Sequence, residues 1–216
     1  MVKKTLVYRI LSRVITTIFF RALKKINGAE NIPQTRPFVI AVNHESYIDP
    51  PIVKGLFDRK FGIVTYFLTK KEVFLNPIKR YFFEQTFTIP VDRDHAGYLA
   101  LEAAIEKLKQ KEVIGVFPEG KRSMDGHLHR GKTGAVRMAI AARCPILPVG
   151  MENSFEAWPP WKKLPSLKKR VIVNIGKPYT FEKYYGKELS KGTLTRLTTQ
   201  LMKKIAVLSK QKIVDD

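Results

Sequence analysis

The sequence contains little cysteine, few acidic residues and no long apolar run, and each shortage excludes a class of protein. Cys144 is the single cysteine among 216 residues, so the chain has neither an internal disulfide nor a cysteine-based zinc site. Because Pro145 follows it, we interpret Cys144 as a small apolar filler and not as a reactive thiol. The apolar stretches fall short of the ~18 residues that a membrane-spanning helix needs. Arginines interrupt the apolar part of the N-terminal segment, which argues against a secretory signal peptide.

Acidic residues are outnumbered two to one by basic residues, and this imbalance indicates an anionic partner. The chain has 39 Lys and Arg against 19 Asp and Glu, a formal net charge of +20. Such a charge attracts nucleic acid, an anionic membrane surface or phosphate-bearing small molecules, and charge alone does not choose among them. The hydrophobic fraction of 44% is ordinary for a globular protein, so we expect one domain with a real core.

Residues 1–26 have the pattern of an amphipathic helix with a basic face. Polar and basic residues recur at helical spacing on one side of this segment, at Arg9, Arg13, Thr17, Arg21 and Lys24. The other side is apolar, with Val7, Leu11, Val14, Ile15, Ile18, Phe19 and Ala22. This pattern is typical of a helix that lies in the plane of lipid headgroups, and also of a helix packed on its own domain. We expect a membrane-interface helix over 1–26 and the main folded domain over 27–216.

The rest of the chain alternates between apolar runs and helical periodicity. This alternation predicts an α/β fold, a single domain with a largely parallel mixed sheet flanked by helices. The expected strands are 38–42, 63–68, 87–91, 113–117, 146–149 and 171–175. The expected helices are a short one from Asp49 and longer ones at 73–83, 98–109, 135–142 and 194–208.

The segment 43–49 follows the first expected strand, where open α/β sheets place their ligand sites. In a turn that leaves a strand, the carboxylate of Asp49 can fold back onto the imidazole of His44. An aspartate that binds one ring nitrogen fixes the tautomer and leaves the other nitrogen to accept a proton. Alternatively, Asp49 before Pro50 caps a helix and His44 is a core histidine.

The segment 117–123 follows another expected strand. Pro118 ends the strand, Gly120 permits a close backbone approach, and Arg122 offers a planar guanidinium for a phosphate. Glu119 could hold a substrate hydroxyl, or the segment is a polar turn with solvated charges. Arg93, which stands between two aspartates, is either ion-paired at the surface or available for a phosphate.

Four segments, in this order, resemble the sequence blocks of the glycerophospholipid acyltransferase family, whose best-known members are lysophosphatidic acid acyltransferases. The Asn-His-x-x-x-x-Asp block is matched by Asn43, His44 and Asp49. The other three blocks are matched by Val91-Asp92-Arg93, by Phe117 to Ser123 and by Leu147-Pro148-Val149, and a basic stretch between the first two blocks is matched by Lys70-Lys71-Glu72. The resemblance covers about residues 30–180. Lys121 departs from it, because the family has threonine there.

The resemblance implies a fatty acyl transfer to a lysophospholipid hydroxyl, with His44 as general base and Asp49 as the group that orients it. It implies that Arg93, Arg122 and Lys70 hold the acceptor phosphate, while Glu119 and Gly120 shape the glycerol site. Asn43, Phe117, Pro118 and Pro148 are motif positions with structural roles.

The partners implied are an acyl thioester donor, of coenzyme A or acyl carrier protein, and lysophosphatidic acid as acceptor. No cofactor is expected. A membrane with anionic lipids is expected to hold the protein peripherally or monotopically on its cytoplasmic face. The chain has no Gly-x-Ser-x-Gly elbow and no catalytic cysteine, which favours direct transfer.

Two other classes of protein compete with this interpretation. Residues Gly126 to Thr133 satisfy the P-loop pattern of nucleotide triphosphatases, although they do not follow a strand directly. Lys132 and the helix start after it are also candidates for binding a donor phosphate. A basic nucleic-acid-binding module is the second alternative, but no recognition motif supports it. His127 and His129 have no cysteine or acidic cluster at ligand spacing, so we expect no metal.

Overall fold

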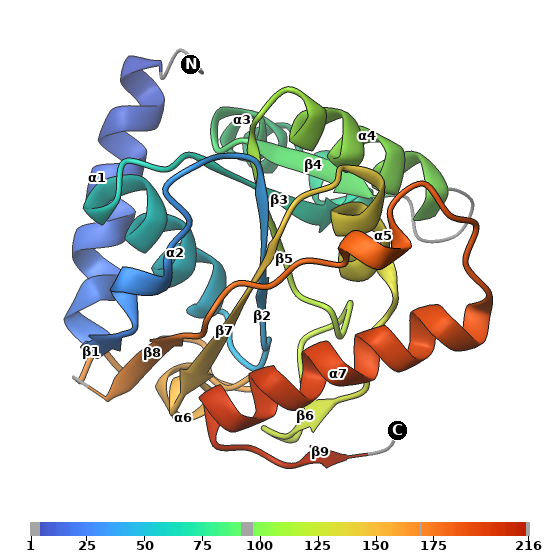
Figure 1. The fold of residues 1–216 in the computed structure, drawn as a ribbon. Helices are drawn as coiled ribbons and strands as arrows, with labels where there is room; N and C mark the ends of the chain where they lie inside the picture. The colour runs from blue at the N-terminus through green and yellow to red at the C-terminus, as the bar shows by residue number, and fades with distance from the viewer. Residues whose placement is uncertain (1–4, 92–96, 169, 215–216) are drawn as a thin grey trace.

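A seven-stranded sheet forms the centre of the molecule (Figure 1). The structure is a computed structural model and describes residues 5–91, 97–168 and 170–214. The strand order is β1-β8-β7-β2-β5-β3-β4, and only the β7–β8 pair is antiparallel. The strands are β1 (Leu23–Asn27), β2 (Phe38–Val42), β3 (Thr65–Lys70), β4 (Thr88–Val91), β5 (Val113–Val116), β7 (Ile146–Glu152) and β8 (Val171–Ile175). The predicted single α/β domain with a largely parallel mixed sheet is confirmed.

Helices cover both faces of the sheet, so the molecule has three layers (Figure 1). One face packs against α1 (Leu6–Phe19) and α2 (Asp49–Gly55), which continues into the π-helical turn Leu56–Lys60. The other face packs against α4 (Gly97–Lys109), α5 (Gly134–Ala141) and α7 (Lys191–Ser209). The remaining helices are α3 (Pro77–Gln85) and α6 (Ser154–Ala157).

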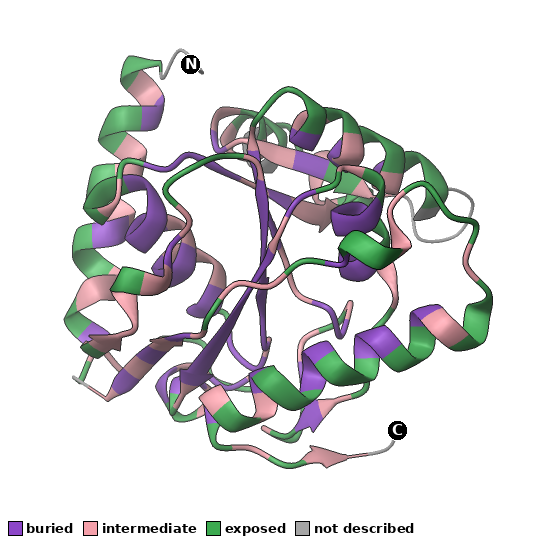
Figure 2. Ribbon diagram, in the orientation of Figure 1, coloured by how far each residue is buried: buried purple, intermediate pink, exposed green. Residues whose placement is uncertain are grey.

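The central strand β2 is buried along its whole length (Figure 2). Phe38, Ile40 and Val42 pack in the core under α1 and α2, while Val39 and Ala41 pack in the core under α4, α5 and α7. A parallel strand covered by helices on both faces must be apolar at every position. This is why residues 38–42 form a continuous apolar run, and why the sequence predicts their bounds correctly.

The prediction that the first helix extends to residue 26 is wrong. The helix α1 ends at Phe19, a 3-10 turn covers Phe20–Ala22, and Leu23–Asn27 form the edge strand β1, which pairs in parallel with β8. A boundary at residue 26 therefore cuts through a strand of the main sheet. Strand pairing decides the conformation here, and the helical spacing of Arg21 and Lys24 does not reveal it.

Other differences are local. The expected helix 73–83 is divided into the 3-10 turn Lys71–Phe74 and α3, which begins at Pro77, since proline is favoured in the first turn of a helix and breaks one further in. Two short strands, β6 (Leu128–His129) and β9 (Ile213–Val214), form a separate parallel pair that the sequence did not predict. This pair brings the C-terminal segment beside the loop that follows β5.

Helix α1 packs on the domain through polar side chains and through Phe19, and it exposes other apolar side chains. Buried Tyr8 donates from its hydroxyl to Asp58 Oδ2 at 2.9 Å, and Ser12 Oγ donates to the same oxygen at 3.0 Å. One turn further on, Thr16 packs on Gly55, where a Cβ would lie 2.5 Å from Thr16 Oγ1. The outer side presents four exposed apolar residues one turn apart: Leu6, Ile10, Val14 and Ile18. In the described part of the chain, no helix combines the length and the apolar character that crossing a bilayer requires.

Candidate active site

The candidate site lies at the carboxyl end of the central strands. The segment 43–49 follows β2, and the segment 117–123 follows β5, which pairs with β2 in parallel. On the other side of β2, the strand β7 ends at Glu152. Because parallel neighbours end at the same edge of the sheet, the loops after these strands meet.

His44 and Asp49 face each other. His44 Nδ1 lies 2.9 Å from Asp49 Oδ2, and this oxygen also accepts hydrogen bonds from Glu45 N at 2.8 Å and Ser46 N at 2.7 Å. The carboxylate of Asp49 is fully buried, while the His44 side chain is 17% exposed. An acceptor on Nδ1 fixes the proton there and leaves Nε2 as the basic nitrogen. The pair therefore has the geometry of an oriented general base.

Asp49 does not cap helix α2. The N-cap position of α2 is Ile48, without a side-chain capping bond, and Asp49 is the first helical residue. The carboxylate instead turns back and binds the amides of the preceding turn together with the imidazole. The alternative prediction, in which Asp49 serves only as a helix cap, is therefore wrong.

The segment after β5 makes three contacts with His44. The backbone N–H of His44 donates to Glu119 Oε1 at 2.7 Å, and its carbonyl accepts from Ser123 N at 2.8 Å. The imidazole stacks on the ring of Phe117, with centroids 4.0 Å apart and planes inclined by 22°. These contacts fix both the position and the plane of the ring.

Glu119 joins two loops with its carboxylate. The side chain is 4% exposed; Oε1 binds His44 N, and Oε2 accepts from His129 N at 3.1 Å. Burial, together with the charge of Asp49, raises the pKa of Glu119 to about 7, although these two hydrogen bonds lower it. The geometry thus favours a positioning role for Glu119 over the predicted contact with a substrate hydroxyl.

The motif residues Asn43 and Pro148 connect β2 to β7. Asn43 Nδ2 donates to the carbonyl of Met151 at 3.0 Å, and Asn43 Oδ1 accepts from Met151 N at 2.7 Å. Pro148 is buried in β7 opposite Ala41 of β2. Both residues therefore stabilise the strands behind the histidine.

Cationic side chains stand beside the pair. The guanidinium carbon of Arg122 lies 3.5 Å from the ring centroid of Tyr47, and Arg122 Nε is buried without a hydrogen-bond partner. Gly120 has a φ of +72°, and a Cβ there would lie 3.0 Å from the side chain of Lys132. Glycine is therefore needed for both the turn and the passage of Lys132.

Of the other two predicted phosphate ligands, Lys70 and Arg93, the structure describes only Lys70. Lys70 is exposed at the end of β3, next to β5 in the sheet, and so lies at the same edge as the segment 117–123. Arg93 lies outside the described residues. Its expected contact with the acceptor phosphate stays a prediction.

Glu45 is a site residue that the sequence did not predict. Its side chain is 3% exposed; Oε1 accepts from Ser154 Oγ at 2.9 Å and Oε2 accepts from Gln211 Nε2. Burial and the charge of Asp49 raise the pKa of Glu45 to about 8, while the hydrogen bonds from Gln211 and Ser154 lower it. Its place next to His44 was a signal, but nothing in the sequence connects it to Gln211, 166 positions away.

The segment 126–133 does not form a phosphate-binding P-loop. Such a loop presents free backbone N–H groups to the phosphates, whereas the amides of Gly126, His127, His129 and Lys132 all donate within the protein. The segment also contains the strand β6. The P-loop alternative is therefore wrong. Among the described residues, no group of three or more His, Cys, Asp or Glu side chains could hold a metal ion.

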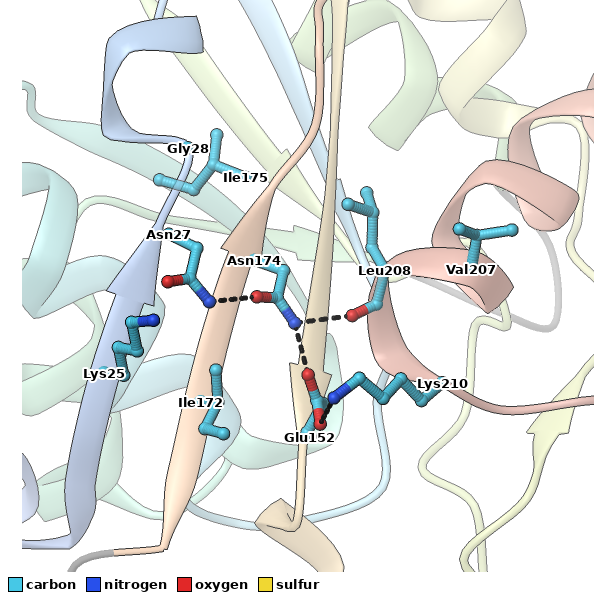
Figure 3. A pocket seen from close by; sticks show the side chains of 10 residues that line it. All are labelled: Lys25, Asn27, Gly28, Glu152, Ile172, Asn174, Ile175, Val207, Leu208 and Lys210. Atoms are coloured by element: carbon cyan, nitrogen blue, oxygen red, sulfur yellow. Dashed lines mark hydrogen bonds and ion pairs between the residues drawn. The ribbon is translucent and has the colours of Figure 1, made fainter.

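An open cavity of about 440 Å³ lies between β1, β8, β7 and the end of α7 (Figure 3). A chain of hydrogen bonds crosses it: Asn27 Nδ2 donates to Asn174 Oδ1 at 2.7 Å, and Asn174 Nδ2 donates to Glu152 Oε1 at 2.6 Å. Lys210 closes the chain through an ion pair with Glu152 Oε2 at 3.1 Å. None of the predicted site residues lines this cavity.

The three-layer α/β domain, with an oriented histidine at the carboxyl edge of its sheet, has the arrangement of an enzyme site. The family described as Acyltransferase matches residues 24–152, which is more than half of the chain, so the chain belongs to the acyltransferase family. This match confirms the family resemblance of its four sequence blocks.

Two similar proteins carry the same name. The 1-acyl-sn-glycerol-3-phosphate acyltransferase of Bacillus subtilis (strain 168) is 34% identical over 133 residues, covering 60% of this chain and 62% of the relative. The enzyme of the same name from Pseudomonas aeruginosa is 28% identical over 168 residues, covering 75% of this chain and 61% of the relative. The matched part of the chain thus spans less than two thirds of the length of these relatives.

A solved structure shares the fold. The 1-acyl-sn-glycerophosphate (LPA) acyltransferase PlsC from Thermotoga maritima superposes with a TM-score of 0.69 over 96% of this chain and 84% of that one. The two sequences are 24% identical, so the likeness shows a common fold.

Proposed function

We propose that this protein transfers a fatty acyl group from an acyl thioester to the hydroxyl of 1-acyl-sn-glycerol 3-phosphate (lysophosphatidic acid). The observation that carries the proposal is the 2.9 Å contact between His44 Nδ1 and the buried carboxylate of Asp49 at the carboxyl edge of the sheet. The names of the relatives support the choice of acceptor. The donor is a thioester of coenzyme A or of acyl carrier protein.

Proton transfer through His44 accounts for the chemistry. Nε2 removes the proton from the acceptor hydroxyl as its oxygen attacks the thioester carbonyl, and the new ester forms when the carbon–sulfur bond breaks. The imidazolium then returns the proton to the thiolate. Asp49 stabilises the imidazolium and keeps the ring in the tautomer that the reaction needs.

The acceptor phosphate needs a cationic site within reach of His44. Arg122 is three residues beyond Glu119, and the amide that follows it binds the carbonyl of His44. Its stacking on Tyr47 holds the guanidinium plane in place for a bidentate contact with phosphate oxygens. Lys132, beside Gly120, adds a second cation, and Lys70 and Arg93 complete the proposed set.

The acceptor is an amphiphile, so we also propose that the protein works on a membrane surface. The exposed apolar residues of α1 form one ridge, Arg9 and Arg13 are exposed on the same helix, and Arg21 is exposed in the 3-10 turn that follows it. A ridge of this kind enters the acyl region while arginines bind anionic headgroups. We propose that this membrane surface is the cytoplasmic face.

The test is an acyl-transfer assay of the purified protein in detergent, with a labelled acyl thioester and a panel of acceptors. We expect transfer to lysophosphatidic acid in preference to acceptors without a phosphate. His44→Ala should lower kcat at least ~100-fold, because the general base is lost. His127→Ala is the matched control, since His127 is an exposed histidine outside the site.

Two results would contradict the proposal. One is the absence of transfer to any hydroxyl acceptor by the wild-type protein. The other is a His44→Ala protein that keeps activity within a few fold of the His127→Ala control. A protein that shifts DNA in a gel but does not float with anionic liposomes would instead support the nucleic-acid-binding class.

A further inference from the structure

The chain does not leave the domain when α7 ends at Ser209. Lys210 adopts a left-handed conformation with a φ of +57°, which reverses the chain toward the active-site loops. Residues 210–214, which we call the C-terminal strap, then run beside these loops. Lys210 binds Glu152 at the end of β7 (Figure 3), and β9 pairs with β6 through Leu128 and His129.

Gln211 connects the strap to the catalytic turn. Its Nε2 donates to Glu45 Oε2 and, at 3.0 Å, to the carbonyl of Gly126. Both partners are acceptors, so the two N–H groups of one amide satisfy them together. The loop residue Gly126 stands between Ser123, which binds the carbonyl of His44, and His129, which binds Glu119.

Glu45 also contacts the His44–Asp49 pair, through its backbone. It is the residue directly after His44, and its backbone N–H donates to Asp49 Oδ2, the oxygen that also binds the imidazole. A shift of the Glu45 side chain would therefore move an amide on which the Asp49 carboxylate depends. The remaining side-chain oxygen of Glu45 binds Ser154 Oγ, so the carboxylate is held from two sides.

An ionised carboxylate at this depth needs donors. Glu45 is 3% exposed and lies near the carboxylate of Asp49, and burial of an unpaired charge is costly. Gln211 and Ser154 supply the donors that offset this cost. Without Gln211, Glu45 loses the donor at Oε2 and the strap loses its bond to residue 45, so the turn that carries His44 is held by fewer contacts.

We propose that Gln211 is a positioning residue of the active site, and that the C-terminal strap fixes the His44–Asp49 turn through the Gln211–Glu45 hydrogen bond. The strap lies beyond residues 24–152, which carry the family match. The kinetic part of this inference rests on the proposed function. The structural part, that the strap holds the His44 imidazole in place against Asp49, does not depend on the proposed function.

The test compares Gln211→Met with Lys212→Met. Methionine keeps the length of glutamine but has no donor, and Lys212 is an exposed neighbour in the same strap. We expect Gln211→Met to lower kcat on the order of tenfold, as misplaced catalytic groups do, while KM for the acceptor is unchanged. Lys212→Met should match the wild type.

Two further readouts separate positioning from general stability. Because Gln211 favours the ionised form of Glu45, its loss raises the pKa of that carboxyl, so the part of the kcat–pH profile that follows the ionisation of Glu45 should move to higher pH in Gln211→Met. The ¹⁵N chemical shifts of the His44 ring, which report its bond to Asp49, should change in Gln211→Met and not in Lys212→Met. Gln211→Lys restores a donor and should recover part of kcat.

Each outcome decides the proposal. Unchanged ring shifts and an unmoved pH profile in Gln211→Met, with or without a lower melting temperature, would overturn it. Altered ring shifts in a protein whose wild type transfers no acyl group would support the structural part and contradict the proposed function. If Gln211→Met does not fold, Gln211→Ala, which also lacks a donor, carries the same comparison against Lys212→Met.

Discussion

Three buried acidic side chains belong to the site around His44, and each has a different partner. Asp49 binds the ring, Glu119 binds the backbone N–H of His44, and Glu45 binds Ser154 and Gln211. The His-x-x-x-x-Asp motif suggests that only His44 and Asp49 form the site. In the structure, Glu119 and Glu45 also help to hold the turn that carries His44. Glu119 and Glu45 have raised pKa values because burial penalises the charged carboxylate, and this has a consequence for stability.

The first residue-scale prediction concerns the pH dependence of folding. The pKa of Glu119 rises from 4.5 to about 7 on folding, so between these values the native state binds more protons than the unfolded state. The free energy of unfolding should then fall as pH rises through this range, by roughly 3 kcal/mol from this residue. Glu119→Gln should flatten that fall in urea titrations at pH 5, 6, 7 and 8.

The exposed Glu30 provides the control for this measurement. Glu30→Gln should give a stability curve parallel to that of the wild type. A Glu119→Gln curve that also ran parallel to the wild type would contradict the assignment of the proton to Glu119.

The second residue-scale prediction concerns Arg122. If its guanidinium binds the acceptor phosphate, Arg122→Ala should raise KM for lysophosphatidic acid about tenfold or more, with a smaller effect on kcat. Arg122→Lys should recover little, because lysine cannot reproduce the planar fork or its stacking on Tyr47. Steady-state kinetics at varied acceptor concentration measures both constants.

Arg196→Ala is the control, since Arg196 is an exposed arginine on α7 that binds Tyr184. An Arg122→Ala enzyme with wild-type KM for the phosphorylated acceptor would place the phosphate elsewhere.

At the scale of elements, α1 shows how one helix serves two interfaces. Its inner side is a polar seam in which Tyr8 and Ser12 bind Asp58 and Thr16 packs on Gly55. The outer side of the helix is exposed (Figure 2) and carries Leu6, Ile10, Val14 and Ile18, while Phe19 packs on the core. An apolar ridge exposed to water is costly, and this cost is removed if lipid covers the ridge.

The ridge predicts the effect of charge placed on it. Ile10→Glu with Val14→Glu should weaken flotation with vesicles of phosphatidylglycerol and phosphatidylcholine by at least about tenfold, because apolar burial is lost and a carboxylate meets anionic headgroups. Val207→Glu is the matched control, because Val207 is 79% exposed on α7. Equal flotation of the two proteins would show that α1 is not the membrane contact.

At the scale of the whole molecule, the sequence predicted most of the sheet because its central strands are buried on both faces. The strands β2 and β8 begin and end at the predicted residues, 38–42 and 171–175. The edge strand β1 was missed since Lys24 and Lys25 interrupt its apolar pattern, and only its pairing with β8 defines it.

The sequence likewise predicted only part of the candidate site. Motif spacing was enough to place His44, Asp49 and the segment 117–123 at one edge of the sheet, because residues that follow neighbouring parallel strands must meet there. Spacing could not show that Glu119 binds two backbone amides, since those amides belong to loops that come together only when the sheet forms. It also could not exclude a P-loop at 126–133, which the hydrogen bonds of its own amides exclude.

The sequence by itself determined the fold class, the cationic character and the histidine–aspartate pair, because these depend on local patterns and on composition. The tertiary structure decided which side of α1 faces the domain, which carboxylates bind backbone and which bind the imidazole, and that Gln211 reaches Glu45. Such contacts join residues up to 166 positions apart. Only the packing of the folded chain brings these residues together, so no pattern of neighbouring residues records them.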